Sequence, residues 1–184
     1  QALIERGSIN SGSVLKVLWN HRWEYDKAPE RLLAALKQFQ PQGLELELYI
    51  VGQQFRQTPD AFIEMKAFID ATAHLHLKRW GFVVDDGEYQ QLLQRADVVV
   101  STAIHDFQGL ALLEAVAAGC IPLAPNRLCY SEWFAEDYLY HCHEHTTSVE
   151  AQALAKALQD LATSKRAGEL PSAPSVAFLS ISQL

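Results

Sequence analysis

The sequence predicts an α/β fold in which a mostly parallel, Rossmann-like sheet carries helices on both faces. Short apolar runs rich in β-branched residues, such as Val98, Val99 and Val100, indicate buried parallel strands. These runs alternate along the chain with longer segments whose apolar residues recur at helical spacing. Alternating strands and helices are typical of a sheet built from crossover units. Ligands of such folds bind at the carboxyl ends of the strands.

The expected strands are short, and several end at a glycine. They cover residues 14–19, 44–51, 75–80, 97–101, 121–124 and 139–140, the last as an edge strand. Gly52 closes the second strand and Gly81 the third. The expected helices cover residues 29–39, 58–73, 86–95, 109–118, 131–134 and 149–162. Pro29 suits a first helical turn, and Thr58 followed by Pro59 suits a helix cap.

Length and composition are those of one globular domain. The chain has 184 residues, of which 49% are hydrophobic and 20% charged, enough for a single core. We expect the domain to cover residues 14–164, between a polar linker or tail at 1–13 and a C-terminal tail at 165–184. Because the sequence begins at Gln1 without an initiator methionine, we expect a piece of a longer protein.

Charge and hydropathy exclude some classes of partner. The net charge of -7 argues against a broad, non-specific nucleic-acid surface, although it permits a local basic patch. No apolar run is long enough to span a bilayer, and no secretory leader pattern is visible. We therefore expect a cytoplasmic protein without a membrane partner.

Residues 141–145, His-Cys-His-Glu-His, resemble a metal-binding cluster in composition. However, alternating ligands on a strand point to opposite faces, and no second ligand cluster complements them. We predict no metal site here and expect a strand end followed by a polar loop. The three cysteines, Cys120, Cys129 and Cys142, lack the spacing of a disulfide framework.

The segment 101–125 has the strongest functional signal. Two carboxylates, Asp106 and Glu114, bracket Gly109 and the start of a short apolar helix. The first N–H groups of such a helix favour a phosphate, and a ribose diol could satisfy a carboxylate on the helix. The alternative is structural: Asp106 caps the helix, and Glu114 is bound by neighbouring backbone donors.

A second polar segment, residues 20–27, follows the first strand. Its Arg22 can clamp phosphate oxygens through a planar guanidinium, and its Lys27 supplies a point charge. The alternative is a solvated loop with weak ion pairs among Arg22, Glu24, Asp26 and Lys27. Because both segments follow strands of one sheet, we expect them to meet at one edge.

These residues resemble the retaining GT-B glycosyltransferases of family GT4. Their motif places two acids eight residues apart across a glycine loop and an apolar helix, as Asp106 and Glu114 do here. Asp106 replaces the usual glutamate and is one methylene shorter. Residues 105–132, together with the His-Arg-Trp-Glu-Tyr-Asp-Lys run at 21–27, are similar to the tRNA-queuosine mannosyltransferase branch, and the resemblance covers residues 13–160.

The resemblance implies roles for individual residues. Asp106 would contact the donor sugar, with His105 as a further hydrogen-bonding candidate, and Glu114 would hold the ribose. Arg22, Lys27 and the backbone amides of the helix start would bind the diphosphate and stabilise its leaving-group charge; those amides belong to Gly109, Leu110 and Ala111. Gly52 would allow close backbone approach to the nucleotide, or would be a plain turn glycine.

The resemblance also implies a reaction. A nucleotide-sugar donor, by branch GDP-mannose, would transfer its hexose with retention to queuosine in a tRNA, without a cofactor or an obligatory metal. The chain would be the donor-binding C-terminal half of a GT-B enzyme whose N-terminal domain is missing, so it should bind donor but transfer little or nothing. Residues 165–184 would be disordered or would pack back on that domain. Alternatives are a non-catalytic α/β nucleotide-binding module, or a GT4 transferase or GT-B-like epimerase with another sugar nucleotide.

Overall fold

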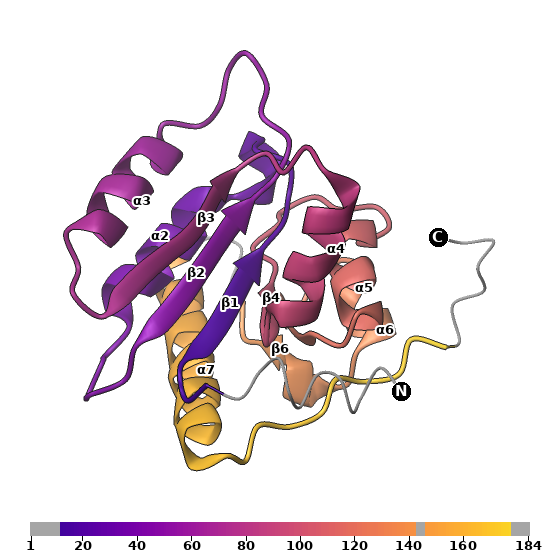
Figure 1. The fold of residues 1–184 in the computed structure, drawn as a ribbon. Coiled ribbons are helices and arrows are strands. Elements are labelled where there is room, and N and C mark those ends of the chain that lie inside the picture. The colour runs from indigo at the N-terminus through magenta and orange to yellow at the C-terminus, as the bar shows by residue number, and fades with distance from the viewer. Residues whose placement is uncertain (1–11, 143–145, 178–184) are drawn as a thin grey trace.

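The computed structural model describes residues 12–142 and 146–177 and arranges them as one parallel sheet between two layers of helices (Figure 1). Every pairing in this sheet is parallel. Its strands are β1 (Leu15–Trp19), β2 (Leu46–Val51), β3 (Leu75–Gly81), β4 (Val98–Val100), β5 (Ile121–Pro125) and β6 (Leu139–Tyr140). The predicted fold class is thus confirmed, including the short edge strand at the end of the sheet.

The strand order determines where a ligand can bind. The sheet runs β3-β2-β1-β4-β5-β6, so the chain moves outward from β1 to β3 and then returns to the other side of β1. The direction of winding reverses between β1 and β4. In open α/β sheets, the loops at the carboxyl ends of the strands diverge at such a switch point and leave a crevice. The segments that follow β1 and β4 are the two segments singled out in the sequence.

Helices cover both faces because buried side chains alternate along the strands. Leu15, Val17 and Trp19 of β1 pack into the core on one face, and Leu18 packs into the core on the other. The first face carries α2 (Pro29–Gln38), α3 (Ala61–Asp70) and α7 (Thr147–Ala167). The second face carries α4 (Asp86–Arg95), α5 (Leu110–Ala117) and α6 (Tyr130–Trp133). Two short 3-10 helices, η1 (Tyr25–Lys27) and η2 (Glu136–Tyr138), complete the described elements.

Helices α3 and α7 differ most from the prediction. Helix α3 begins at Ala61 instead of Thr58, because the Pro59 carbonyl accepts the Phe62 amide at 3.2 Å in a tight turn before the helix. Helix α7 runs to Ala167, five residues further than expected, and ends at Gly168 in the left-handed conformation, with φ of 74°. The first residues of the predicted C-terminal tail are therefore helical.

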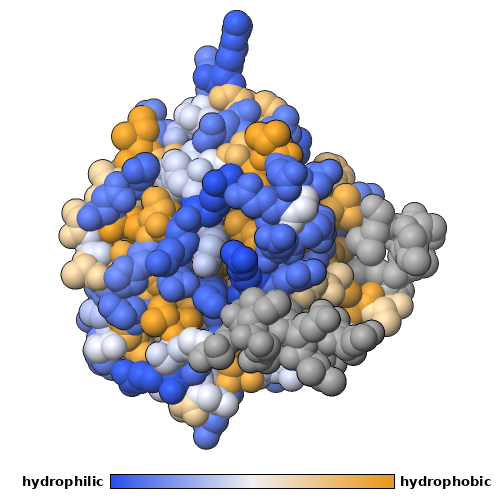
Figure 2. All heavy atoms as spheres, in the orientation of Figure 1, coloured by the Kyte–Doolittle hydropathy of each residue, from blue (hydrophilic) through white to orange (hydrophobic). Residues whose placement is uncertain are grey.

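The described part of the chain has no metal cluster of the kind considered in the sequence. Cys142 donates its thiol to the carbonyl of Asn126 at 3.4 Å, and residues 143–145 lie outside the described ranges. Among the described residues, no group of three or more His, Cys, Asp or Glu side chains could hold a metal ion. None of the helices in these ranges has the length and apolarity needed to cross a membrane. The face seen in Figure 1 mixes polar and apolar side chains (Figure 2).

Candidate functional site

The two polar loops meet at the switch point, as the sequence predicted. The amide of Ile104 donates to the carbonyl of Asp26 at 2.8 Å, and Thr102 donates its hydroxyl to the carbonyl of Lys27 at 2.7 Å. The indole of Trp19, at the end of β1, donates to that same Thr102 hydroxyl at 3.0 Å. Main-chain and side-chain bonds therefore join the loop after β1 to the loop after β4.

Lys27 places its ammonium group between the two loops. Its side chain is 8% exposed, and Nζ donates to the carbonyl of His105 at 2.8 Å. Nζ also lies 3.5 Å from a carboxylate oxygen of Asp26 and 3.9 Å from one of Asp106. The following residue, Ala28, has φ of 49°, a left-handed conformation that costs a non-glycine residue energy. A strained turn thus holds a buried cation beside Asp106.

Asp106 lies in the loop just before α5 and has a partner on each carboxylate oxygen. Oδ1 accepts the Gly109 amide at 3.1 Å, and Oδ2 accepts the phenol of Tyr130 at 2.7 Å. The bond to Gly109 is the local turn bond expected of an acid near a helix start. The bond to Tyr130 comes from a residue 24 positions away, which local capping does not require. The capping alternative therefore accounts for only one of the two contacts.

The start of α5 packs closely against the Tyr130 ring. Gly109 has φ of 58°, which favours glycine, and an added Cβ would lie 3.2 Å from the Tyr130 ring. No side chain caps the helix, and a helix leaves its first N–H groups without intrahelical partners. Asn20, which follows β1, donates to the carbonyl of Ala111 at 2.9 Å and to the phenol of Tyr89 at 3.0 Å. Asn20 therefore anchors the first turn of α5. Leu110, the first residue of this helix, remains exposed.

Three residues of this site were not among the predicted site residues. His21 is 2% exposed, and its Nε2 lies 2.8 Å from the hydroxyl of Ser101, which donates to Tyr130 at 2.8 Å. Burial lowers the pKa of His21 to about 4, against the opposing charge of Asp106, so the ring is neutral. The sequence signals for His21 and Ser101 were their positions just after β1 and β4, whereas Tyr130 lies on α6, after β5.

Two predicted residues take a different place from Lys27 and Asp106. The side chain of Arg22 is 58% exposed and lies 3.5 Å from the carboxylate of Glu24. This is the surface ion pair left open as the alternative. His105 points its exposed side chain outward, and it is its carbonyl that accepts Lys27. Contact of either side chain with a ligand stays a prediction.

Glu114 differs from the sequence argument in its burial. The carboxylate is exposed, and Oε1 accepts the side-chain amide of Gln90 on α4 at 3.1 Å. The reasoning that a buried acid on an apolar helix needs a diol does not apply, because water reaches the group. The buried side chains of α5 lie on its other faces, so the Glu114 side chain is accessible to solvent or to a ligand. A role in ribose binding stays a prediction.

Gly52 is needed for a reason that neither alternative named. A Cβ at this position would lie 1.8 Å from the carbonyl oxygen of His21 and 3.0 Å from the Trp23 ring. The loop after β1 therefore crosses directly over the end of β2, and only glycine allows it. The close approach expected here is to the site loop itself, and approach to a nucleotide stays a prediction.

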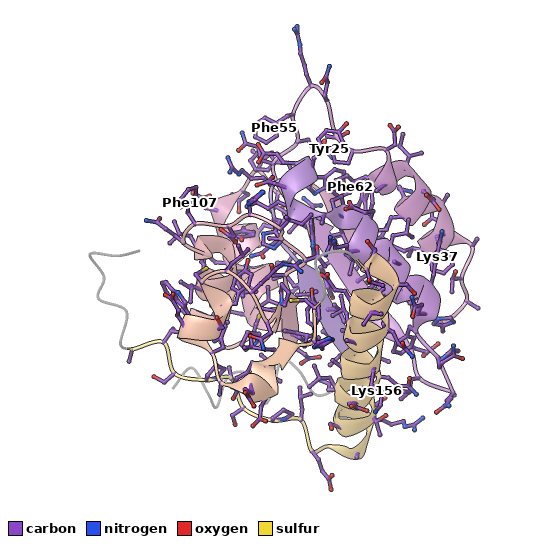
Figure 3. The ribbon with its side chains drawn as sticks, turned by 180° about the vertical axis from the view of Figure 1, so that it is seen from behind. Tyr25, Lys37, Phe55, Phe62, Phe107 and Lys156 are labelled. Atoms are coloured by element: carbon purple, nitrogen blue, oxygen red, sulfur yellow. The ribbon has the colours of Figure 1, made fainter. Side chains whose placement is uncertain are left out.

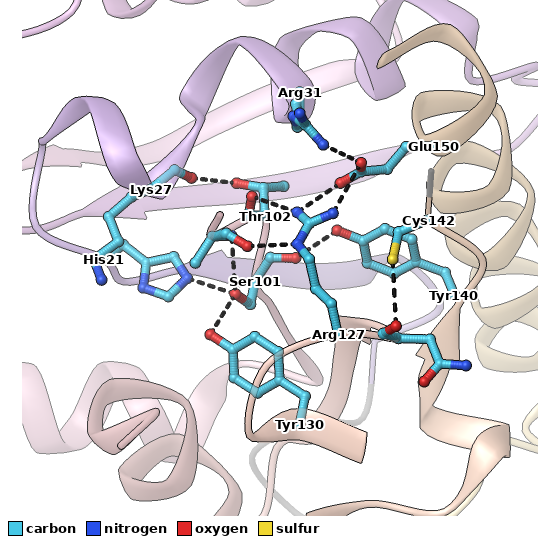
Figure 4. A network of polar contacts seen from close by, with 12 residues as sticks. His21, Lys27, Arg31, Ser101, Thr102, Arg127, Tyr130, Tyr140, Cys142 and Glu150 are labelled. Atoms are coloured by element: carbon cyan, nitrogen blue, oxygen red, sulfur yellow. Dashed lines mark hydrogen bonds and ion pairs between the residues drawn. The ribbon is translucent and has the colours of Figure 1, made fainter. Parts of the chain in front are cut away.

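An ion network around Glu150 lies next to the site (Figure 4). Glu150 of α7 is 1% exposed and accepts Arg127 at 3.0 and 2.9 Å as well as Arg31 of α2. Arg127 in turn donates to the carbonyls of Thr102 at 3.1 Å and Ala103 at 2.8 Å. The network therefore fixes the backbone of Thr102 and Ala103, at the beginning of the loop that carries Asp106.

The chemistry available at this edge is that of anion and hydroxyl recognition. A buried ammonium and the helix start favour phosphate oxygens, and an oriented carboxylate next to them can accept hydroxyl groups. Asp106 and Glu114 are not the paired carboxylates of nucleophilic glycoside cleavage, since Glu114 faces α4 and Asp106 faces Lys27.

Comparison with known proteins agrees with this chemistry. The profile of the family described as "Glycosyl transferases group 1" matches residues 6–173. The tRNA-queuosine alpha-mannosyltransferase of Drosophila melanogaster is 36% identical over 129 residues, which cover 69% of this chain and 32% of that protein. The chain thus spans about a third of the length of this relative.

Solved structures show the same fold. The catalytic domain of cholesterol-alpha-glucosyltransferase from Helicobacter pylori is 18% identical with a TM-score of 0.60, covering 84% of this chain and 91% of that one. Sucrose-phosphate synthase from Thermosynechococcus elongatus is 22% identical with a TM-score of 0.62, covering 89% and 40%. Anabaena HepE, solved with UDP and glucose, is 19% identical with a TM-score of 0.62, covering 91% and 46%. The fold is that of a GT-B glycosyltransferase domain, and the chain belongs to the family of group 1 glycosyl transferases.

Proposed function

We propose that this chain is the donor-binding half of a retaining GT4 glycosyltransferase whose complete form transfers mannose from GDP-mannose to queuosine in tRNA. The observation that carries donor binding is the pairing of Lys27 and Asp106 at the start of α5, with 3.9 Å between Nζ and Oδ1. The named reaction is supported by the 36% identity to the queuosine mannosyltransferase. The proposed reaction takes place in the cytoplasm and uses no metal.

Each group has a distinct task in this proposal. Lys27 and the first amides of α5, at Gly109, Leu110 and Ala111, bind the diphosphate and stabilise its charge as the sugar leaves. Asp106 accepts hydroxyl groups of the sugar. Glu114 and Arg22, whose side chains are both exposed, contact the ribose and the phosphates when the donor is bound.

The proposed partner is an N-terminal GT-B domain facing the carboxyl ends of the strands. Four aromatic side chains stand exposed along the loops that follow β1 to β4, and three of them are labelled toward the upper part of Figure 3. These side chains are Tyr25 at 67%, Phe55 at 41%, Phe82 at 55% and Phe107 at 100% exposure. Exposed apolar side chains grouped on one edge of a domain are typical of a surface that another domain covers.

Calorimetric titration of the chain with GDP-mannose, UDP-glucose, UDP-galactose, GDP and UDP tests the proposal. We expect GDP-mannose to bind more tightly than the uridine donors. Tighter binding of a uridine donor would contradict GDP-mannose as the donor but would still support donor binding by this domain. If none of the five ligands binds at millimolar concentration, the donor-binding function is wrong. We also expect no transfer of mannose to tRNA by this chain alone, and measurable transfer would contradict that expectation.

A further inference from the structure

A chain of hydrogen bonds leads from the core to the carboxylate of Asp106. His21 Nε2 lies 2.8 Å from Ser101 Oγ, Ser101 Oγ lies 2.8 Å from the Tyr130 phenol, and that phenol lies 2.7 Å from Asp106 Oδ2. Figure 4 shows the first two links, which meet at the hydroxyl of Ser101. Because His21, Ser101 and Tyr130 are at most 2% exposed, water does not compete for these bonds.

The direction of every bond in this chain follows from the carboxylate end. An ionised carboxylate only accepts, so Tyr130 donates its single proton to Asp106. Ser101 must then donate its own proton to Tyr130, and the neutral ring of His21 must donate from Nε2 to Ser101. The amide of Ala103 adds a second donor to Ser101 at 3.2 Å. All links therefore point toward Asp106, and aligned hydrogen bonds strengthen one another.

This series of hydrogen bonds holds the Asp106 carboxylate in one orientation. Tyr130 holds Oδ2 and the Gly109 amide holds Oδ1, so rotation of the carboxylate would break one bond or both. Each carboxylate oxygen still has acceptor capacity beyond its one protein partner. The Oδ1 side also lies toward Lys27, at 3.9 Å. The remaining acceptor sites are thereby fixed next to the cation.

We infer that Tyr130, backed by Ser101 and His21, is a positioning residue that orients Asp106 for the sugar of the donor. The inference rests on the proposed function, in which Asp106 meets the sugar and Lys27 the diphosphate. Tyr130 touches neither ligand. Its effect should therefore appear in the sugar-dependent part of binding and not in binding of the nucleotide diphosphate.

The test compares Tyr130→Phe with Tyr140→Phe in calorimetric titrations with GDP-mannose and GDP. Tyr140 is a matched control, because it is also buried and donates its phenol, at 2.7 Å, to the carbonyl of Ser101 and not to Asp106. For Tyr130→Phe, we expect the ratio of the GDP-mannose and GDP dissociation constants to rise about three- to tenfold, the value of one net hydrogen bond. For Tyr140→Phe, we expect an unchanged ratio.

Each other outcome has a definite meaning. A variant that weakens both ligands equally, or neither, would show Tyr130 to be structural and would overturn the inference while leaving donor binding intact. If Tyr130→Phe does not fold, Ser101→Ala decides, because it interrupts the same chain one link earlier; an unchanged ratio there also overturns the inference. If the unmodified chain binds no sugar nucleotide more tightly than its diphosphate, the assigned contact of Asp106 fails, and the inference fails with it.

Discussion

Replacing Glu150 with glutamine tests whether the buried ion network holds the site in place. Glu150→Gln keeps the shape of the side chain but removes the single negative charge between Arg31 and Arg127. The Glu150 side chain is 1% exposed, and the two arginine side chains are 9% and 11% exposed. Two buried guanidinium groups would be left without a counter-charge.

The expected loss of stability follows from this burial. Removing one partner of a buried ion pair costs about 3–5 kcal/mol, because the remaining charge is left desolvated. Since Glu150 serves two arginines, we expect the upper part of that range, about 4–5 kcal/mol. The loss should reach the site, because Arg127 also holds the carbonyls of Thr102 and Ala103.

Urea unfolding followed by tryptophan fluorescence measures this loss, and the chain contains four tryptophans. The matched control is Glu64→Gln, which removes the charge from an ion pair whose side chains, Lys37 and Glu64, are 45% and 62% exposed. Such exposed pairs contribute about 0–1 kcal/mol. If Glu150→Gln costs no more than Glu64→Gln, the buried network contributes no more to folding stability than an exposed ion pair.

Three further changes test the site loop. Lys27→Met should weaken GDP binding about tenfold or more, because charge-assisted phosphate contacts are lost, whereas calorimetry should find no change for Lys66→Met at an exposed ion pair with Asp70. Gly52→Ala should cost about 2–3 kcal/mol in thermal unfolding, since its Cβ would lie 1.8 Å from a backbone oxygen, whereas Gly12→Ala, with no atom within 4 Å, should cost nothing. Because burial lowers the pKa of His21 from its usual 6.5 to about 4, the unfolded chain takes up a proton first as the pH falls. The free energy of unfolding from urea titration should therefore be about 2 kcal/mol lower at about pH 5 than at about pH 7. His21→Gln should remove this difference. An unchanged pH dependence in that variant would show that His21 is not the group responsible.

The sheet was predictable because each strand is marked by residues that are close together in the sequence. Runs such as Val98 to Val100 have few alternatives to a buried strand, and the glycines at 52 and 81 mark their ends. The prediction ended α7 five residues too early, although Lys165 and Arg166 before a glycine are a signal for the end of a helix. The start of α3 was less certain, since a proline near a helix start fits both a first turn and the turn before it.

The meeting of Lys27 and Asp106 was predictable from topology, but the partners of Asp106 were not. Parallel strands bring their following loops to one edge, so the order of elements was sufficient to place these two residues together. The bond from Tyr130 depends instead on how α6 packs against the sheet, and that of His21 on a contact 80 residues away. Neither leaves a periodic or spacing signal. The exposure of Glu114 depended likewise on the packing of α4 beside α5.

The most direct test of donor binding at this edge is an NMR titration of the isotopically labelled chain with GDP-mannose, followed through the backbone amides. We predict the largest shifts at the start of α5, at Gly109, Leu110 and Ala111, and in the loop of residues 20–27. The groove between α2 and α7, lined by Lys37, Gln152 and Lys156, should remain unchanged. Shifts confined to that groove, with the amides of α5 unaffected, would contradict donor binding at the Lys27 and Asp106 site.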